Sequence, residues 1–265
     1  MRLLEGLNAR SITFTRQLEN GLPRLMFWWI IFASMACGMR AAFAATPVEG
    51  AASHVTQLMP YILVVAAPAV SMMLALRWFP RDADFAQPET RLALWGRWRG
   101  IAPAEARAMP HYGAAGLMAS LLLGMLLNVP VRMLEFLAAI PALGDSAPEW
   151  LRLLFGLMLI DVVVFSSLYV IACVAALRHV PLFPRMLAAI WGLDLLMQVG
   201  IARVADGIIQ FPPPVAHALA DLLDGNLKKV LISAAIWCPY LLLSRRVNLT
   251  YRCRVPIQSH AYIES

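Results

Sequence analysis

The chain has 265 residues, of which 60% are hydrophobic and only 14% are charged. A soluble domain carries roughly 25% charged residues, so the composition excludes an ordinary water-soluble protein. The net charge of +6 alone would suit a nucleic-acid binder, but the basic residues lie in loops between apolar runs, so we expect no nucleic-acid partner.

Six apolar runs are long enough to cross the roughly 30 Å hydrocarbon core of a bilayer as helices. They cover residues 25–45, 57–77, 113–131, 153–177, 186–203 and 229–244. The last run is short and contains Pro239 near its end, where a missing backbone donor is tolerated. The sequence therefore predicts an all-α fold, a polytopic transmembrane helical bundle of about six spans.

Arginine and lysine are divided unevenly between the two sides of this topology. Sixteen of the 22 lie in the N-terminal segment, the second and fourth loops and the C-terminal tail, and five lie on the opposite side, while Arg40 falls within the first span. Because cytoplasmic loops hold an excess of Lys and Arg, both termini are expected in the cytoplasm.

The chain divides into four predicted segments. Residues 1–78 form an amphipathic segment and a transmembrane hairpin, and residues 79–111 form an Arg-rich cytoplasmic loop in which 92–98 is predicted to be an interfacial helix. Residues 112–255 form a four-helix membrane unit, and 256–265 a cytoplasmic tail. The first span also resembles a signal peptide, with a small-x-small site at Ala42-Phe43-Ala44, so its cleavage is an open alternative.

No sequence pattern indicates a cofactor, a metal centre or catalysis. The four cysteines form no CxxC pair and are expected to be small buried apolar residues. The expected spans contain no histidine to ligate haem, and no phosphate-binding, hydrolase or metalloprotease motif is present. We therefore expect no enzyme and no cofactor.

Small and polar residues recur every fourth position along the third span. Such a stripe lets a second helix approach closely, and the alternative is a substrate path along the same face. Arg132, at the end of the stripe, precedes Glu135 by three positions, so an interfacial ion pair is expected there. The predicted packing groove consists of Gly116, Ser120, Gly124 and Asn128.

Asp161 and Asp194 lie at mid-span, where a carboxylate costs roughly 2.5–3.5 kcal/mol even on the insertion scale. Each is about nine residues from its own span boundary, on consecutive helices joined by a short loop, so both are expected at one depth and side by side. Two adjacent carboxylates then share a proton or bind a cation, and Gln198 completes the polar site. The alternative is a structural, hydrogen-bonded role for each aspartate.

Two segments resemble the DUF2569 family of small bacterial membrane proteins. A W-x-P-Y helix end leads into S-x-R-V and a threonine followed by an aromatic residue, at Trp237, Pro239, Tyr240, Ser244, Arg246, Val247 and Thr250, and an F-P element stands at Phe183 and Pro184. The resemblance covers about residues 110–255, and Asn248 and Tyr251 depart from it. It implies a four-span module of the bacterial inner membrane and leaves the activity open.

These observations favour a non-enzymatic accessory or assembly subunit of a membrane complex. Its partners would be membrane lipids and a second membrane protein or another copy of this chain, bound through the small-residue groove and the basic face. The alternative function is a small transporter or a proton- or ion-coupled conduit that uses the mid-membrane carboxylates.

The topology can be tested with reporter fusions. An alkaline phosphatase fused after Gly144 is expected to be active and one fused after Ala108 inactive, because arginine asymmetry places the second loop in the cytoplasm. Green fluorescent protein at the same positions should give the reverse pattern. Activity of the phosphatase at both positions would contradict the predicted orientation.

Overall fold

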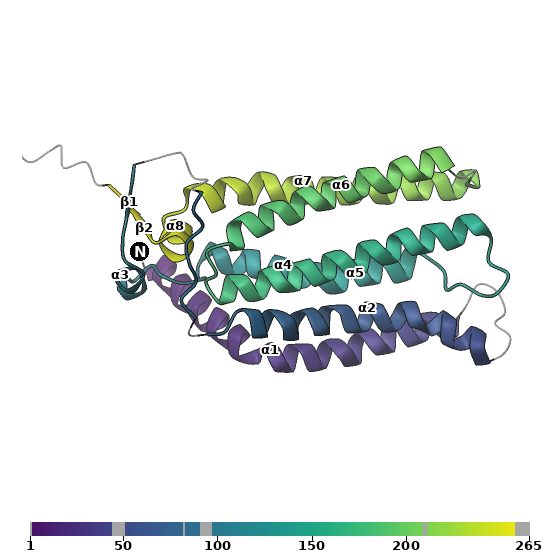
Figure 1. Ribbon diagram of the computed structural model, residues 1–265, viewed down its shortest axis with the longest axis horizontal. Helices are drawn as coiled ribbons and strands as arrows, with labels where there is room; N and C mark the ends of the chain where they lie inside the picture. Colours follow the sequence, from purple (N-terminus) through teal and green to yellow (C-terminus); the bar gives the residue numbers. More distant parts are fainter. Residues whose placement is uncertain (1, 44–50, 82, 91–96, 209–210, 258–265) are drawn as a thin grey trace, which may run out of the picture.

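The computed structural model describes residues 2–43, 51–81, 83–90, 97–208 and 211–257. Within these ranges the chain forms a helical bundle with one short two-stranded ribbon at one end (Figure 1). In chain order the elements are α1 (Arg2–Ala42), α2 (Ala51–Trp78), β1 (Trp98–Gly100), α3 (Pro103–Ala108), α4 (Leu117–Ala139), α5 (Glu149–Leu177), α6 (Phe183–Ile208), α7 (Pro213–Leu243), α8 (Arg245–Arg252) and β2 (Arg254–Pro256).

Six of the helices, α1, α2, α4, α5, α6 and α7, are long and apolar enough to cross a membrane. The predicted all-α polytopic bundle is therefore confirmed, and the chain is a multi-pass membrane protein. The first and last helices are longer than the apolar runs predicted. α1 begins at Arg2 and takes in the expected amphipathic segment, and α7 begins at Pro213, not near residue 229.

The early start of α7 has a physical reason. Its first half carries charged side chains that lower the mean hydropathy, so a search for apolar runs misses it. These charges suit a helix, because Asp224 and Lys228 form an i,i+4 ion pair on its exposed surface. The second half alone is apolar enough to appear as a span in the sequence.

Four pairs of consecutive long helices pack against each other, namely α1 with α2, α4 with α5, α5 with α6 and α6 with α7, whereas α2 packs on α5 and not on α4. α5 is central, because α2, α4 and α6 all lie against it, while α7 packs on α6 (Figure 1). Two apolar cores fill the bundle, one around Phe165 and Leu187 and the other around Met133 and Phe155. The N-terminal hairpin contributes to both cores, through Leu22 to the first and Tyr61 to the second.

The two ends of the bundle differ in construction. The terminal end holds the start of α1, the loop 178–182, α3, α8 and the ribbon; the opposite end holds the loop 140–148 and the link between α6 and α7 (Figure 1). β1 pairs antiparallel with β2, Arg99 opposite Val255. At the opposite end the Arg40 guanidinium donates hydrogen bonds to the Ile140 carbonyl, which ties α1 to the last turn of α4.

The loop between α2 and α4 differs from the prediction. Of the interfacial helix expected over 92–98, residues 92–96 lie outside the described residues, and Trp98 belongs to β1, where the Arg254 guanidinium lies over its ring. The short helix in this loop is α3. The strand β1 has only three residues, and its partner lies more than 150 residues away in the sequence. Such a strand has no local residue pattern from which it could be predicted in place of a helix.

Buried side chains of α8 hold the terminal end together. The Tyr251 hydroxyl donates to the Ala176 carbonyl at 2.8 Å, and its ring packs on Phe183. Asn248 is fully buried: its amide donates to the Leu242 and Ser244 carbonyls, and its Oδ1 accepts from the side chains of Arg252 and Arg254. α8 therefore locks the end of α7 onto the loop between α5 and α6.

His179 follows α5 in the left-handed conformation, with φ of 54°. Its ring packs edge-on against Tyr112, at 5.0 Å between centroids, and it also contacts Tyr251. Burial lowers the pKa of His179 from 6.5 to about 4, because the charged imidazolium would lose its hydration there. The folded chain therefore holds this histidine neutral at pH values where the unfolded chain protonates it.

The stability contributed by neutral His179 should be complete above pH 6.5 and be lost as the pH falls towards 4. The unfolded chain takes up a proton in this window that the folded chain refuses, so the free energy of unfolding should fall by about 2 kcal/mol between pH 7 and pH 5. Reversible unfolding in mixed micelles measures it. His179→Asn, which tolerates the left-handed backbone, should lack this contribution; an identical pH dependence in both proteins would contradict the assignment.

Candidate functional site

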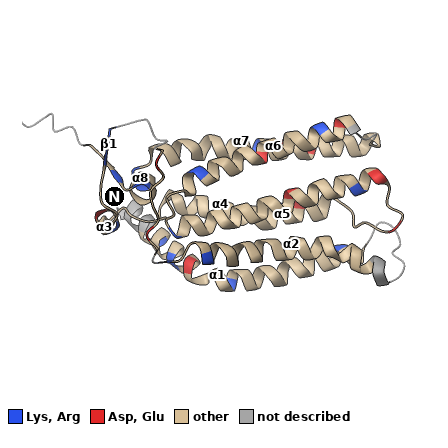
Figure 2. Ribbon diagram, viewed as in Figure 1, with Lys and Arg blue, Asp and Glu red and all other residues tan. Residues whose placement is uncertain are grey.

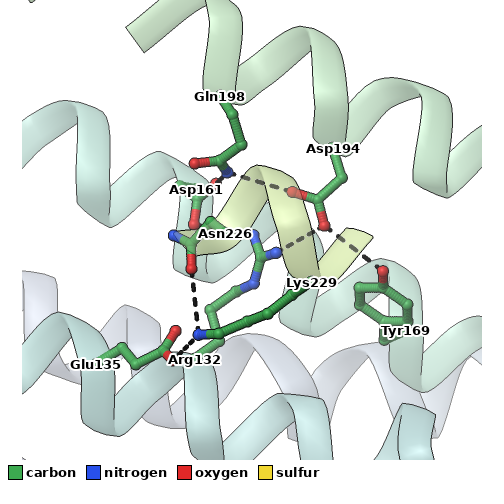
Figure 3. A network of polar contacts seen from close by, with 8 residues as sticks. All are labelled: Arg132, Glu135, Asp161, Tyr169, Asp194, Gln198, Asn226 and Lys229. Carbon is green, nitrogen blue, oxygen red and sulfur yellow. Dashed lines mark hydrogen bonds and ion pairs between the residues drawn. The ribbon is translucent and has the colours of Figure 1, made fainter. Parts of the chain in front are cut away.

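A buried polar cluster joins three helices near the middle of the bundle. Arg132 of α4 donates to Asp161 of α5, with 2.9 Å between Nη1 and Oδ2, and to Asp194 of α6, with 2.6 Å between Nη2 and Oδ2. Gln198 donates from Nε2 to Oδ1 of both aspartates, at 3.0 and 3.2 Å (Figure 3). Together, these four residues form the Arg–Asp cluster.

The cluster is almost sealed from solvent. Asp194 is 0% exposed, Gln198 2%, Asp161 3% and Arg132 8%. The Phe165 ring covers the Arg132 guanidinium at 4.6 Å from its centroid, and the Tyr169 hydroxyl lies 3.5 Å from Asp194 Oδ2. Ion pairs in such surroundings are screened little by water, so they are far stronger than pairs on the protein surface.

The expected meeting of Asp161 and Asp194 is present in the structure. α5 and α6 are antiparallel neighbours joined by residues 178–182, and each aspartate lies about eleven to sixteen residues from the loop end of its helix. At about 1.5 Å per residue, both lie roughly 16–24 Å from that end. Gln198, one turn after Asp194, lies on the same face and completes the polar site as expected.

The prediction that Arg132 pairs with Glu135 was wrong. α4 continues two turns beyond Arg132, to Ala139, so this arginine lies inside the bundle and not at an interface. Its partners are the two aspartates, whereas Glu135 pairs with Lys229 of α7 in a more exposed position (Figure 3). Arg132 pairs with the buried carboxylates and not with Glu135, because a charge left unpaired away from water is far more costly than an exposed one.

The charges of the cluster do not balance when both aspartates are ionised. Two carboxylates face one guanidinium, which leaves one negative charge in contact with the neutral groups of Gln198 and Tyr169. A buried uncompensated charge costs several kcal/mol, of the order of 3–5. One proton or one cation equivalent would remove it, so the geometry provides a place for a single positive charge.

A cavity of about 760 Å³ borders the cluster at Gln198. It lies between α6 and α7, in the half of the bundle next to the opposite end, and Gln198 is among the residues that line it. The Gln198 Oε1 atom is buried and accepts no hydrogen bond within the described structure. The walls are otherwise mainly apolar, and Asp206 and Asp224 contribute carboxylates.

The residues of the predicted packing groove do not form one face with Arg132. Gly116 precedes α4, with φ of 66°, and its N–H donates to Ser11 Oγ of α1. Ser120 and Gly124 are exposed on the membrane side, and a methyl group added at Gly124 would meet no atom within 4 Å. Asn128 is partly buried, and no helix of the described chain fills the space at Gly124.

Helical geometry explains why the stripe does not reach the cluster. Four residues turn an α-helix by about 400°, so each step of four drifts by about 40°. From Gly116 to Arg132 the drift is about 160°, which takes Arg132 to the side facing α5 and α6. The common face assumed for the two groups does not exist.

The segments that resemble the family motif meet at the terminal end. Phe183 lies against Tyr251, and Val247 and Phe183 share one apolar core, while Trp237 and Tyr240 pack edge to face at its margin. The remaining motif positions are at the same end. Thr250 accepts a hydrogen bond from the Gly113 N–H, and Arg246 approaches Gly116. Pro239 lies in the last turns of α7, Ser244 follows α7, and Pro184 is the second residue of α6.

Comparisons of the chain with protein-family models, with curated proteins and with solved structures give no match. The resemblance to the DUF2569 family therefore stays a prediction from the quoted residues. No group of three or more histidine, cysteine, aspartate or glutamate side chains suited to a metal ion occurs among the described residues.

Replacing Arg132 tests the electrostatics of the cluster. Arg132→Met leaves two buried carboxylates together and should lower the free energy of unfolding by about 3–5 kcal/mol. Adding Asp161→Asn and Asp194→Asn to the same protein should recover most of this loss, because neutral amides still bond to Gln198. Reversible unfolding in mixed micelles gives both values.

Lys229→Met is the matched control, since it also removes a cation from an ion pair between helices. That pair is largely exposed, so the cost should stay below about 1 kcal/mol. Equal losses in Arg132→Met and Lys229→Met, or no recovery in the triple variant, would show that the cluster is not held by its charges.

Proposed function

We propose that this chain is a small, non-enzymatic transporter or proton-coupled conduit of the bacterial inner membrane. The Arg–Asp cluster is its ion-handling site. The observation that carries the proposal is the pairing of two buried carboxylates with one guanidinium, beside a cavity that Gln198 of the same cluster lines. Ionisable groups inside a membrane usually mark ion or substrate pathways, because they are too costly to be kept otherwise.

The cavity supports an ion-handling role over a purely structural one. A structural ion-pair network needs no access, and a balanced pair would serve it better than three charges. Here Gln198 connects the two aspartates to a space of about 760 Å³. Protons or cations entering from the opposite end would reach the cluster through this residue.

On the other side, the route towards the terminal end is filled by apolar side chains. Phe165, Tyr169 and Trp191 are all buried beyond the cluster. The proposal therefore assigns access to the cavity side alone, as expected for one state of a protein that alternates between two openings. In the orientation predicted from arginine asymmetry, the open side is the extracytoplasmic one.

An accessory-subunit role is the second candidate, and a separate observation favours it. The open space at Gly124 adjoins an apolar groove of about 390 Å³ between α1 and α4, where Leu123 and Trp28 are among the lining residues. A transmembrane helix of a partner protein would fit such a groove. A stoichiometric partner that co-purifies with the wild type and is lost in Gly124→Leu would support this role.

The ion-handling proposal is tested by proton movement in liposomes. Liposomes containing the purified chain and the dye pyranine should acidify inside under an inside-negative potassium diffusion potential, faster than empty liposomes. Asp161→Asn and Asp194→Asn should each lower this rate at least tenfold, because each removes one of the two groups that exchange the proton.

Asp84→Asn is the control for the loss of a carboxylate, since Asp84 lies far from the cluster and pairs with Arg107 at the terminal end. This variant should retain the wild-type rate. Wild-type liposomes that behave as empty ones, or aspartate variants of the cluster with unchanged rates, would contradict the proposed function.

A further inference from the structure

The cavity between α6 and α7 has the size and lining of a binding site for a small molecule. Its volume of about 760 Å³ lies within the roughly 300–1,000 Å³ range of ligand pockets. Small residues make it wide: Ala202 and Ala205 lie on the α6 side and Ala216 and Ala220 on the α7 side. Leu219, Leu223 and Phe211 give it apolar walls.

The polar side chains that line this cavity are Gln198, Asp206 and Asp224. With both carboxylates ionised, the amide nitrogen of Gln198 is the single hydrogen-bond donor among these side chains. That nitrogen is already used, because it donates to both aspartates of the cluster. The Gln198 Oε1 atom is left as a buried acceptor that accepts no hydrogen bond within the described structure. An unmade hydrogen bond of this kind costs about 1–3 kcal/mol, which a ligand carrying a donor would recover.

The charge of the lining points the same way. Asp206 and Asp224 line the cavity, and none of its described lining residues is an arginine or a lysine. Asp224 pairs with Lys228, which lies outside the lining. Asp206 takes part in no ion pair within the described ranges, so it offers a negative charge to whatever enters.

From this arrangement we propose that the cavity binds an organic cation: a protonated amine with an apolar body. Its N–H would donate to Gln198 Oε1, its body would lie against the alanine and leucine walls, and Asp206 would attract its charge. A neutral lipid chain would satisfy the walls but leave Oε1 without a donor. An organic anion would meet the carboxylates and the excess negative charge of the cluster.

A second part of this inference rests on the proposed function and concerns the bound amine and the proton of the Arg–Asp cluster. An ammonium group on Gln198 Oε1 would be one amide away from both aspartates, so it would supply the positive charge that the cluster otherwise takes as a proton. The bound amine and the proton then exclude each other, which is the thermodynamic basis of exchange. Charged and titratable groups around the aspartates are Arg132 and Tyr169, followed by the mutually paired Glu135 and Lys229 (Figure 3).

Calorimetric titration of the full chain in lipid nanodiscs tests the ligand class, with empty nanodiscs subtracted. The probes are 4-phenylbutylamine, 4-phenylbutanol and 4-phenylbutyrate, which share one apolar body and differ in charge and in donors. The amine should bind saturably, one per chain, at least tenfold more tightly than the alcohol, and the carboxylate should not bind. Equal affinities for the three probes, or no binding of the amine, would overturn the proposal.

Two variants locate the bound amine. Ala220→Phe fills the cavity from α7 and should weaken amine binding at least tenfold, whereas Ala218→Phe, on the same helix but outside the lining, should stay within twofold of wild type. Asp206→Asn removes the lining charge and should weaken binding by a smaller factor, about three- to tenfold. Wild-type affinity in both Ala220→Phe and Asp206→Asn would place the amine elsewhere and overturn the proposed site.

The pH dependence separates this inference from the proposed function. Amine affinity should rise with pH, by up to tenfold per unit where the cluster gives up its proton, and this dependence should vanish in Asp194→Asn. If the amine binds specifically but its affinity does not depend on pH, and no protons move in liposomes, the ligand class is supported and the exchange of amine for proton is refuted. Proton movement without amine binding would refute the ligand class alone.

Discussion

A single guanidinium shared by two carboxylates, buried near the middle of the bundle, is the interaction on which this structure depends. Arg132, Asp161 and Asp194 come from three different helices, so the pairing fixes α4, α5 and α6 relative to one another. The same pairing is one positive charge short. With both aspartates ionised the cluster would carry a buried negative charge, which is costly, and the proposed ion-handling role rests on this imbalance.

The rest of the bundle is arranged around this cluster in an asymmetric way. Towards the terminal end, a dense apolar core and the hydrogen bonds of Tyr251 and Asn248 close the protein, and α8 and the ribbon cover it. Towards the opposite end, a cavity lies between α6 and α7. Basic side chains gather at the terminal end, while residues of both signs occur towards the opposite end (Figure 2). The charged residues that line the cavity, Asp206 and Asp224, are both acidic.

The fold class was largely predictable from the sequence, because hydrocarbon thickness and backbone hydrogen bonding leave a chain this apolar few options. Where charges interrupt an apolar run, prediction failed. The first half of α7 was missed for its lysines and aspartates, and α4 was ended too early at Arg132. The ribbon of β1 and β2 was beyond prediction, since its pairing joins distant short segments with no local pattern.

The candidate site was predicted in part. Depth along the helix and a short connecting loop were enough to bring Asp161, Asp194 and Gln198 together, since both follow from the rise per residue. The role of Arg132 was not found, although its distance from the start of α4 places it at the same level. A sequence gives the depth of a side chain but not the direction in which a helix turns it, so a local partner, Glu135, was preferred to a distant one. The cavity depends on how α6 and α7 pack against each other, which no residue pattern encodes.

The central claim is that the Arg–Asp cluster binds and releases one proton. Infrared difference spectroscopy of the chain in nanodiscs, recorded as the pH is raised, follows the C=O stretch of protonated carboxyl groups directly. Subtracting the spectra of a variant carrying both Asp161→Asn and Asp194→Asn from those of the wild type isolates the cluster. The account predicts a band equivalent to one protonated carboxyl per chain that disappears as the pH rises; no difference between the two proteins at any pH would contradict it.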